Sequence, residues 1–208
     1  VAPRQEVLPG GMPNGMSQTG YSPVQRPVSN TPYTYAPTNA TNLTTREDYG
    51  QPVDFSYLLS RDKKIVSFVG TTKNGTSFVV NNVARLLASK GIRTAILDTT
   101  QNKNSYYIFT NNEENLRKIA YNSITELRNG QPVGINVDKN LSVFTSLPGE
   151  DKGIDDYSRI LETLVKNYSV ILIDCDFQTN EEYFRSSQEI YLVQSLDVLT
   201  IQPFTAFL

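Results

Sequence analysis

The sequence contains no histidine, one cysteine and no long apolar run, and each shortage excludes a class of protein. Without histidine there is no imidazole general base, no histidine-based catalytic triad and no histidine metal ligand. Cys175 has no second cysteine with which to form an intrachain disulfide, which suits a reducing cytoplasm. No apolar stretch approaches the ~20 residues of a membrane-spanning helix, and the start carries no signal-peptide pattern.

An excess of basic charge is also absent, since the formal net charge is −2. No global basic field therefore attracts nucleic acid or anionic lipid, so a nucleic-acid partner is not indicated. We expect a cytoplasmic protein that meets a membrane only through partners or through segments outside this chain.

The composition changes sharply near residue 60. Eight of the eleven prolines lie in residues 1–60, among Gly, Ser, Thr, Asn and Gln. Such a stretch buries too little apolar surface to offset its ordering entropy, so we expect residues 1–60 to be a disordered tail or linker. A second interpretation makes its tyrosines, Tyr21, Tyr33 and Tyr35, points of partner docking or modification. Residues Val53–Leu59 are expected to form a short element that docks on the edge of the following domain.

From Lys64 onward, apolar strands alternate with amphipathic helices. Strands are expected at Ile65–Val69, Thr94–Asp98, Leu141–Thr145, Val170–Asp174 and Ile190–Val193. Helices are expected at Ser77–Lys90, Asn112–Tyr121, Ser123–Arg128 and Asp155–Tyr168. This alternation predicts an α/β fold with three layers and a doubly wound, mostly parallel sheet over residues 61–208. Leu199–Leu208 resembles the start of a further helix, so we expect the domain to be incomplete at its C-terminus and to continue past Leu208.

The inner face of the first predicted helix, Ser77–Lys90, is expected to carry the apolar residues spaced by three and four. These residues are Val79, Val80, Val83, Leu86 and Leu87.

Residues 70–77 match a phosphate-binding loop that lacks its lysine. The pattern G-x-x-x-x-G-K-S/T finds its glycines at Gly70 and Gly75 and its hydroxyl at Ser77, but Thr76 occupies the lysine position. The loop follows a predicted strand and opens into a predicted helix, which is the context in which backbone N–H groups cradle phosphates. The sequence therefore predicts the cradle without its main cation.

Polar side chains follow two other strands at the points where they end. The strand Thr94–Asp98 ends in an aspartate and is followed by Thr99-Thr100-Gln101-Asn102. The strand Val170–Asp174 also ends in an aspartate, followed by Cys175-Asp176. Ligands bind beyond the carboxyl ends of strands in an open parallel sheet. An aspartate at the position of Asp174 is suited to holding Mg²⁺ in a nucleotide hydrolase, although many α/β strands end in Asp for structural reasons.

Four blocks of the chain, in order, resemble the MinD/ParA group of deviant phosphate-loop ATPases. The group's loop G-K-G-G-V-G-K-T-T aligns with residues 70–78, and its G-x-x-V-L-x-x-D-x-D aligns with residues 91–100. Its L-x-V-L-P-A-G is matched near residues 141–149, and its Y-D-x-V-I-I-D at residues 168–174. The resemblance covers some 145 residues from Lys64 to Leu208 and implies the P-loop NTPase fold. Within the group, the pilus-localising CpaE/TadZ branch is the most similar.

Three charged positions of that family are threonine in this chain. The family's signature lysine falls on Thr71, its phosphate-loop lysine on Thr76 and its second acidic residue on Thr100. One cation, Lys73, stands where the family has glycine. Either Lys73 substitutes for a lost lysine, or it is simply solvated and hinders phosphate approach.

The resemblance implies a nucleotide site, with Mg²⁺ bound together with ATP or ADP if the loop still works, and no cofactor if it is fully degenerate. Asp98 takes the catalytic position, while Ser77 and Asp174 take the metal positions. The nucleotide-binding positions are Gly70, Thr71, Thr72, Lys73, Asn74, Gly75, Thr76, Ser77 and Phe78.

The leading functional hypothesis is a degenerate MinD/ParA-like scaffold or positioning factor with weak or no ATP hydrolysis. It would form a homodimer, bind proteins of a localisation or envelope machine, and associate with a pole or membrane through those partners. The alternative is a slow ATPase whose nucleotide-dependent dimerisation localises a pilus, secretion, conjugation or partition machine. A bacterial tyrosine-kinase-like protein ranks below both, because the lysine and a C-terminal tyrosine cluster are missing. A dinucleotide-binding dehydrogenase is disfavoured because G-x-G-x-x-G is absent.

Overall fold

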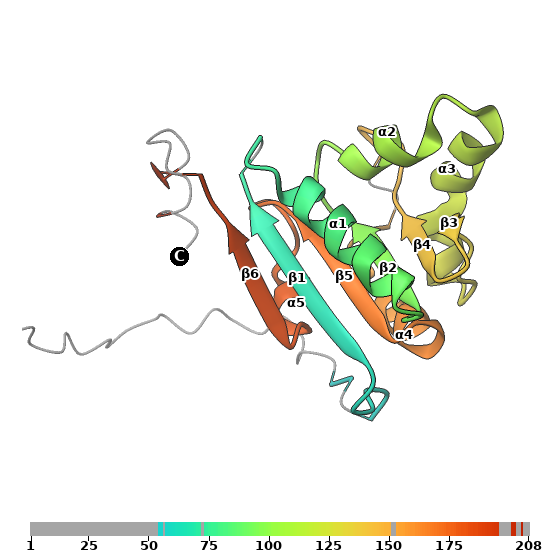
Figure 1. The fold of residues 1–208 in the computed structure, drawn as a ribbon, viewed down its shortest axis with the longest axis horizontal. Helices are drawn as coiled ribbons and strands as arrows, with labels where there is room; N and C mark the ends of the chain where they lie inside the picture. Colours follow the sequence, from blue (N-terminus) through green and yellow to red (C-terminus); the bar gives the residue numbers. More distant parts are fainter. Residues whose placement is uncertain are drawn as a thin grey trace, which may run out of the picture. The chain divides into compact units, whose positions relative to one another are not determined.

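A computed structural model describes residues 54–55, 57–71, 73–150, 153–195, 201, 202 and 205. Most of the predicted tail therefore lies outside the described residues, as does most of the predicted helix at Leu199–Leu208. The described part is built on a six-stranded sheet in the order β3-β4-β2-β5-β1-β6 (Figure 1). The strands are β1 (Lys64–Gly70), β2 (Thr94–Asp98), β3 (Ile135–Asp138), β4 (Leu141–Phe144), β5 (Val170–Cys175) and β6 (Glu189–Val193). The helices are α1 (Thr76–Ser89), α2 (Asn104–Thr110), α3 (Glu114–Arg128), α4 (Tyr157–Asn167) and α5 (Glu181–Arg185).

The sheet is parallel except at one edge. β1 pairs in parallel with β5 and β6, and β2 pairs in parallel with β4 and β5. Only β3 runs antiparallel, to β4. The registers bring Asp98 opposite Asp174, so the two strand-ending aspartates predicted from the sequence are direct neighbours at the carboxyl ends of β2 and β5.

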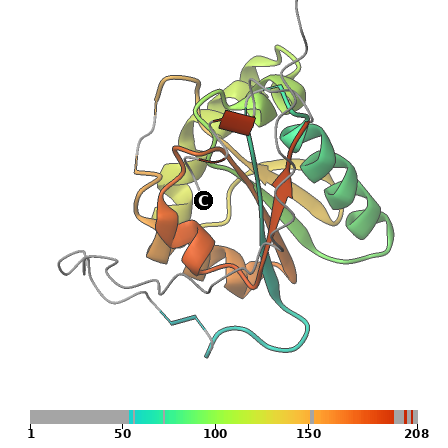
Figure 2. The same ribbon diagram turned by 90° about the vertical axis from the view of Figure 1, so that its left-hand side faces the viewer.

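Helices cover both faces of the sheet and form the predicted three layers (Figure 2). On one face, the core cluster contains Val80, Ala84 and Ala88 of α1 together with Tyr106 and Phe109 of α2. On the other face, α4 and Tyr183 of α5 pack over β1, β2 and β5. α3 contributes to both clusters at the β4 end of the sheet. The α/β fold class expected from the sequence is confirmed.

Phe55 is buried in the second of these clusters, and Leu58 and Leu59 pack against it. The backbone N–H groups of Leu58 and Leu59 both donate to the carbonyl oxygen of Phe55. This turn, just before β1, agrees with the short docking element predicted at Val53–Leu59 for the residues that the structure describes.

The two helices predicted at Asn112–Tyr121 and Ser123–Arg128 are one helix, α3, so that division was wrong. Asn122 lies at the expected break, where its side-chain amide donates to the carbonyl oxygen of Lys118 at 3.1 Å. Because Asn122 forms this bond within its own helix, its polar side chain does not interrupt the backbone pattern.

Three short elements, α2, β3 and α5, were not predicted. β3 has four residues and a register irregularity between Asn136 and Asp138, so the strand is too short to show a recognisable alternation of apolar and polar residues. α5 did carry a start signal, since the Asn180 side chain accepts a hydrogen bond from the N–H of Glu182 at 3.0 Å.

The inner face of α1 also differs from the prediction. Val80 is buried and Val79, Val83 and Leu87 pack half-buried against the core, as predicted, but Leu86 is 60% exposed. The buried face also includes Ala84 and Ala88, which were not predicted. None of the described helices is both long and apolar enough to cross a membrane.

β6 forms one edge of the sheet and is apolar but poorly covered. Ile190, Tyr191 and Leu192 are all exposed, although Tyr191 stacks on Phe68 of β1 with ring centroids 5.2 Å apart. Successive strand residues point to opposite faces, so β6 is uncovered on both faces by the residues that the structure describes.

Candidate functional site

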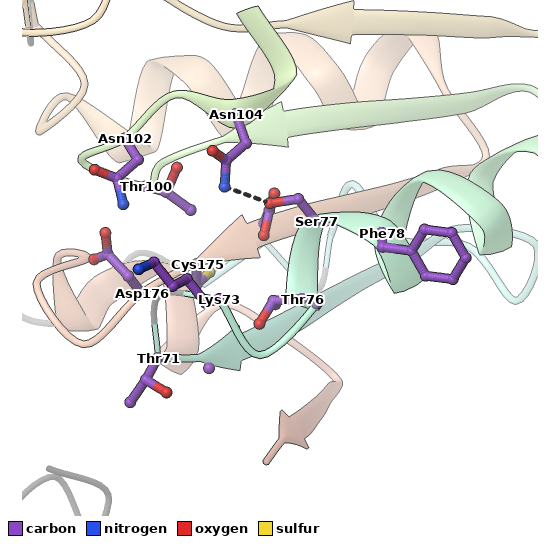
Figure 3. Close-up of a pocket in the computed structure, with 13 residues that line it drawn as sticks. Thr71, Lys73, Thr76, Ser77, Phe78, Thr100, Asn102, Asn104, Cys175 and Asp176 are labelled. Atoms are coloured by element: carbon purple, nitrogen blue, oxygen red, sulfur yellow. Dashed lines mark hydrogen bonds between the residues drawn. The ribbon is translucent and has the colours of Figure 1, made fainter. Parts of the chain in front are cut away.

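A cavity of about 230 Å³ lies where β1 runs into α1 (Figure 3). It is formed by the loop between these elements, by the segment after β2 and by the end of β5. This position matches the expectation that a ligand site lies beyond the carboxyl ends of the strands. The residues that line it are Gly70, Thr71, Lys73, Gly75, Thr76, Ser77, Phe78, Thr100, Asn102, Asn104, Asp174, Cys175 and Asp176.

The N-terminus of α1 opens into this cavity without a side-chain cap. Its N-cap residue, Gly75, has a left-handed backbone (φ 82°), and among the described residues no side chain caps the first turn. The first turn also contains no acidic residue. Uncapped N–H groups and the positive end of the helix dipole favour an anion at this position.

Thr76, at the lysine position of the loop, is directed inward. Its side chain is buried, and its hydroxyl has no hydrogen-bond partner among the described residues. A Cβ atom added to Gly70 would lie 2.3 Å from the Thr76 hydroxyl oxygen, so the two residues are tightly packed. Thr76 therefore fills space under the loop and supplies no positive charge.

Asp174 and Ser77 form the polar floor of the cavity. Asp174 is fully buried, and neither of its carboxylate oxygens accepts a well-formed hydrogen bond from a described residue. Burial, together with the negative charges of Asp98 and Asp176, raises the pKa of Asp174 to about 8, although the nearby Ser77 hydroxyl opposes the rise. Ser77 accepts a hydrogen bond from the side-chain amide of Asn104 at 3.1 Å. A buried carboxylate without a partner beside a hydroxyl is suited to a hard cation.

The donor set fits Mg²⁺ better than a metal held only by protein. Among the described residues there is no group of three or more His, Cys, Asp or Glu side chains that could hold a metal ion. Mg²⁺ commonly keeps several waters and is bound through one or two protein oxygens together with substrate phosphates. Ser77 and Asp174, the metal positions predicted from the sequence, both line the cavity and carry such oxygens, and their role as Mg²⁺ ligands stays a prediction.

Asp98, the predicted catalytic residue, is not among the residues that line the cavity. Its carboxylate accepts hydrogen bonds from the N–H (3.1 Å) and hydroxyl (2.7 Å) of Thr100 and from the N–H of Ser105 (2.9 Å). Burial raises the pKa of Asp98, while the Thr100 hydroxyl and the positive charge of Lys103 lower it. Lys103 itself is only 1% exposed. In this structure Asp98 anchors the segment between β2 and α2.

Asp176 connects the two loops on the far side of the cavity. One of its oxygens accepts from the N–H of Gln101 at 2.7 Å, and the other accepts from the N–H of Gln178 at 2.8 Å. The neighbouring Cys175 also lines the cavity, but burial raises the pKa of its thiol to about 12. Cys175 therefore stays protonated near neutral pH and is not a nucleophile.

Most of the predicted nucleotide-binding positions meet at this cavity, together with Asp174. Thr72 lies outside the described residues, and Asn74 is turned to its own loop, where it donates to the Thr71 hydroxyl. Asn104 was missed. It lies six residues after the end of β2, in a segment that the strand-end rule marks as a ligand region, but no pattern singles it out.

No protein-family model matches this chain, and no curated protein matches its sequence. Among solved structures, the fold is similar to that of a plasmid partition protein from Borrelia burgdorferi, with a TM-score of 0.53 and 21% identity over 70% of this chain and 73% of that one. A protein of Borrelia burgdorferi B31 assigned to plasmid partition and bound to AMPPNP is similar with a TM-score of 0.51 and 21% identity, over 70% of this chain and 69% of that one. The chimerical protein CapA2B2 is similar with a TM-score of 0.51 and 20% identity, over 71% of this chain and 70% of that one. These likenesses show a shared fold.

Proposed function

We propose that this protein is a positioning factor of the MinD/ParA type that holds a nucleoside di- or triphosphate weakly and hydrolyses it slowly or not at all. The observation that carries the proposal is the cavity at the N-terminus of α1. It keeps an uncapped helix end and the Ser77–Asp174 pair, but threonine occupies three positions at which the family that the chain resembles has a charged residue.

Nucleotide binding is supported by the geometry of the cradle. The N–H groups of the first turn of α1 would hold phosphate oxygens, and Ser77 and Asp174 would hold Mg²⁺. When bound, Mg²⁺ would neutralise charge on the phosphates. The structural neighbour bound to AMPPNP supports an adenine nucleotide as the ligand to test first.

Weak turnover follows from the three threonines. Phosphoryl transfer depends on positioning and on stabilising the charge that develops in the transition state. Removing one such stabilising group typically lowers a rate by about 10²–10³-fold, and Thr71 and Thr76 each stand where a lysine would be. Thr100 donates its hydroxyl to Asp98, so it is occupied in holding the β2–α2 segment.

The biological role would then come from binding and assembly. We propose a homodimer that recruits proteins of a pilus, secretion, conjugation or partition machine, with the CpaE/TadZ branch as the model. The partition proteins among the structural neighbours support a positioning role. A slow ATPase is the second candidate, and the presence of Lys73 at the cavity favours it.

Calorimetric titration of the 208-residue protein with ATP in the presence of Mg²⁺ tests the proposal, together with an assay of phosphate release. We expect weak but saturable binding and no release above the buffer rate. Absence of binding by both ATP and ADP would overturn the nucleotide site, and sustained turnover would overturn the non-hydrolysing role in favour of the slow ATPase.

Restoring a lysine tests whether charge is what the cradle lacks. Thr76→Lys is expected to strengthen ATP binding about 10-fold or more, since a charged hydrogen-bond donor returns to the phosphates. Thr125→Lys, on the exposed face of α3, adds the same charge away from the site and is expected to change nothing. Equal effects of the two variants would show that the gain is a non-specific effect of net charge.

A further inference from the structure

We propose that Lys73 is the residue whose positive charge contacts the phosphates in this loop, in place of the lysine that Thr76 replaces. The inference rests on the proposed nucleotide site and specifies which side chain of this chain completes it. The family that this chain resembles has glycine at this position, so the proposed role of Lys73 is not part of the family's pattern.

Lys73 is placed at the cavity by an unusual backbone conformation. Its φ is 70°, in the left-handed region that residues other than glycine and asparagine seldom adopt. The chain therefore keeps a lysine at a position where glycine would fit with less strain. Figure 3 shows the Lys73 side chain reaching across the cavity toward the loops that follow β2 and β5.

Lys73 is also the only cationic side chain among the described residues that line the cavity. Two carboxyl groups, those of Asp174 and Asp176, line the same cavity. An entering phosphate chain therefore meets acidic groups on the floor and far wall, and among the described lining residues positive potential comes only from the α1 N-terminus and Lys73. A lysine at the rim of a partly enclosed site, where water screens charges less, is well placed to attract the phosphates.

The competing partner for Lys73 is Asp176, toward which its amino group is turned in Figure 3. Both oxygens of Asp176 already accept backbone N–H groups, from Gln101 at 2.7 Å and Gln178 at 2.8 Å. No ion pair joins Lys73 to Asp176 or to another described residue. Asp176 is thus engaged in joining two loops, and the ammonium group of Lys73 can turn to a phosphate without breaking a bond.

Titration with ADP in the presence of Mg²⁺, using the 208-residue protein, tests the inference. Lys73→Gln is expected to weaken ADP binding about 10-fold or more, because it removes a charged donor to the phosphates. Lys73→Arg keeps the charge and is expected to bind within about 3-fold of the unchanged protein. Lys90→Gln removes an exposed lysine at the other end of α1 and is expected to have no effect.

A second variant separates binding from folding. Lys73→Gly removes the cation and at the same time relieves the left-handed backbone, so we expect it to raise the thermal midpoint of the free protein while it weakens ADP binding. A variant that merely unfolded could not show both effects. If the unchanged protein binds ADP and Lys73→Gln binds it equally well, the inference is overturned and the nucleotide site stands. If the unchanged protein binds no ADP, both are overturned.

Discussion

Asp98 and Asp174 are paired residues on adjacent strands, yet they differ in their hydrogen-bond partners and in the charges around them. Asp98 is satisfied by Thr100 and Ser105 and is accompanied by the buried Lys103. Asp174 has neither a cation beside it nor a well-formed hydrogen bond from a described residue. A buried carboxylate of this kind is unfavourable unless it is protonated or receives a cation. This difference separates a residue that holds the fold from one that is available to a ligand.

The raised pKa of Asp174 predicts how stability depends on pH. Between the ordinary carboxyl pKa and about 8, the folded protein holds a proton on Asp174 that the unfolded chain has lost, so this residue lowers stability progressively as pH rises through that range. Asp174→Asn should remove the penalty. We expect its gain in thermal midpoint to be larger at pH 8 than at pH 5, measured by circular dichroism without metal. A gain that is equal at both pH values would contradict the raised pKa.

At the scale of the element, the two glycines of the loop are required for different reasons. A Cβ atom on Gly70, at the end of β1, would lie 2.3 Å from the Thr76 hydroxyl oxygen and 2.6 Å from the carbonyl oxygen of Val193. Gly75 has open space around it but a φ of 82°. Gly70 is therefore needed for close approach of α1 and β6, and Gly75 for the left-handed turn into α1.

Alanine substitutions distinguish the two reasons. Gly70→Ala is expected to cost about 1–3 kcal/mol of unfolding free energy through overpacking, and Gly75→Ala about 1–2 kcal/mol through backbone strain. Adding Thr76→Ala should recover part of the loss in Gly70→Ala, because it removes one of the two clashing atoms, but none in Gly75→Ala. Urea denaturation of the single and double variants measures this coupling. Strictly additive effects at Gly70 would show that Thr76 does not make the contact.

At the scale of the whole molecule, one sheet with a core on each face makes the domain a single structural unit. One cluster packs α4 and α5 against the sheet, and the other packs α1 and α2 against its opposite face. β1, β2 and β5 contribute residues to both clusters. We therefore expect a single cooperative unfolding transition.

Two leucine-to-alanine variants test this core. Leu164 of α4 is 0% exposed, whereas Leu86 of α1 is 60% exposed. Leu164→Ala is expected to lower the unfolding free energy by about 2–5 kcal/mol, and Leu86→Ala by no more than about 0.5 kcal/mol. Urea denaturation followed by circular dichroism measures both. A large loss in Leu86→Ala would restore the predicted inner face of α1 and contradict the observed orientation.

Much of the fold could be predicted because long helices and buried strands carry their signal locally. β5 was recognised from its continuous apolar run, and α4 from Ile160, Leu161, Leu164 and Val165, which are all fully buried. The short elements carry weaker signals. In the first turn of α2, the N–H of Ser105 donates to Asp98 at the end of β2. This bond joins two elements, and the apolar pattern of a seven-residue helix cannot reveal it.

The candidate site shows the same division. The loop glycines, Ser77 and Asp174 follow from spacing and from the positions of strand ends, so the amino-acid order by itself determined that these residues lie together beyond the carboxyl ends of the strands. That they cradle a phosphate stays a prediction. Only the tertiary structure decided which polar groups meet there. It brought Asn104 to Ser77 and left Asp174 without a well-formed hydrogen bond, while it turned Asp98 into its own loop. The physical reason is that local patterns specify elements, whereas hydrogen-bond partners and burial depend on how distant elements pack.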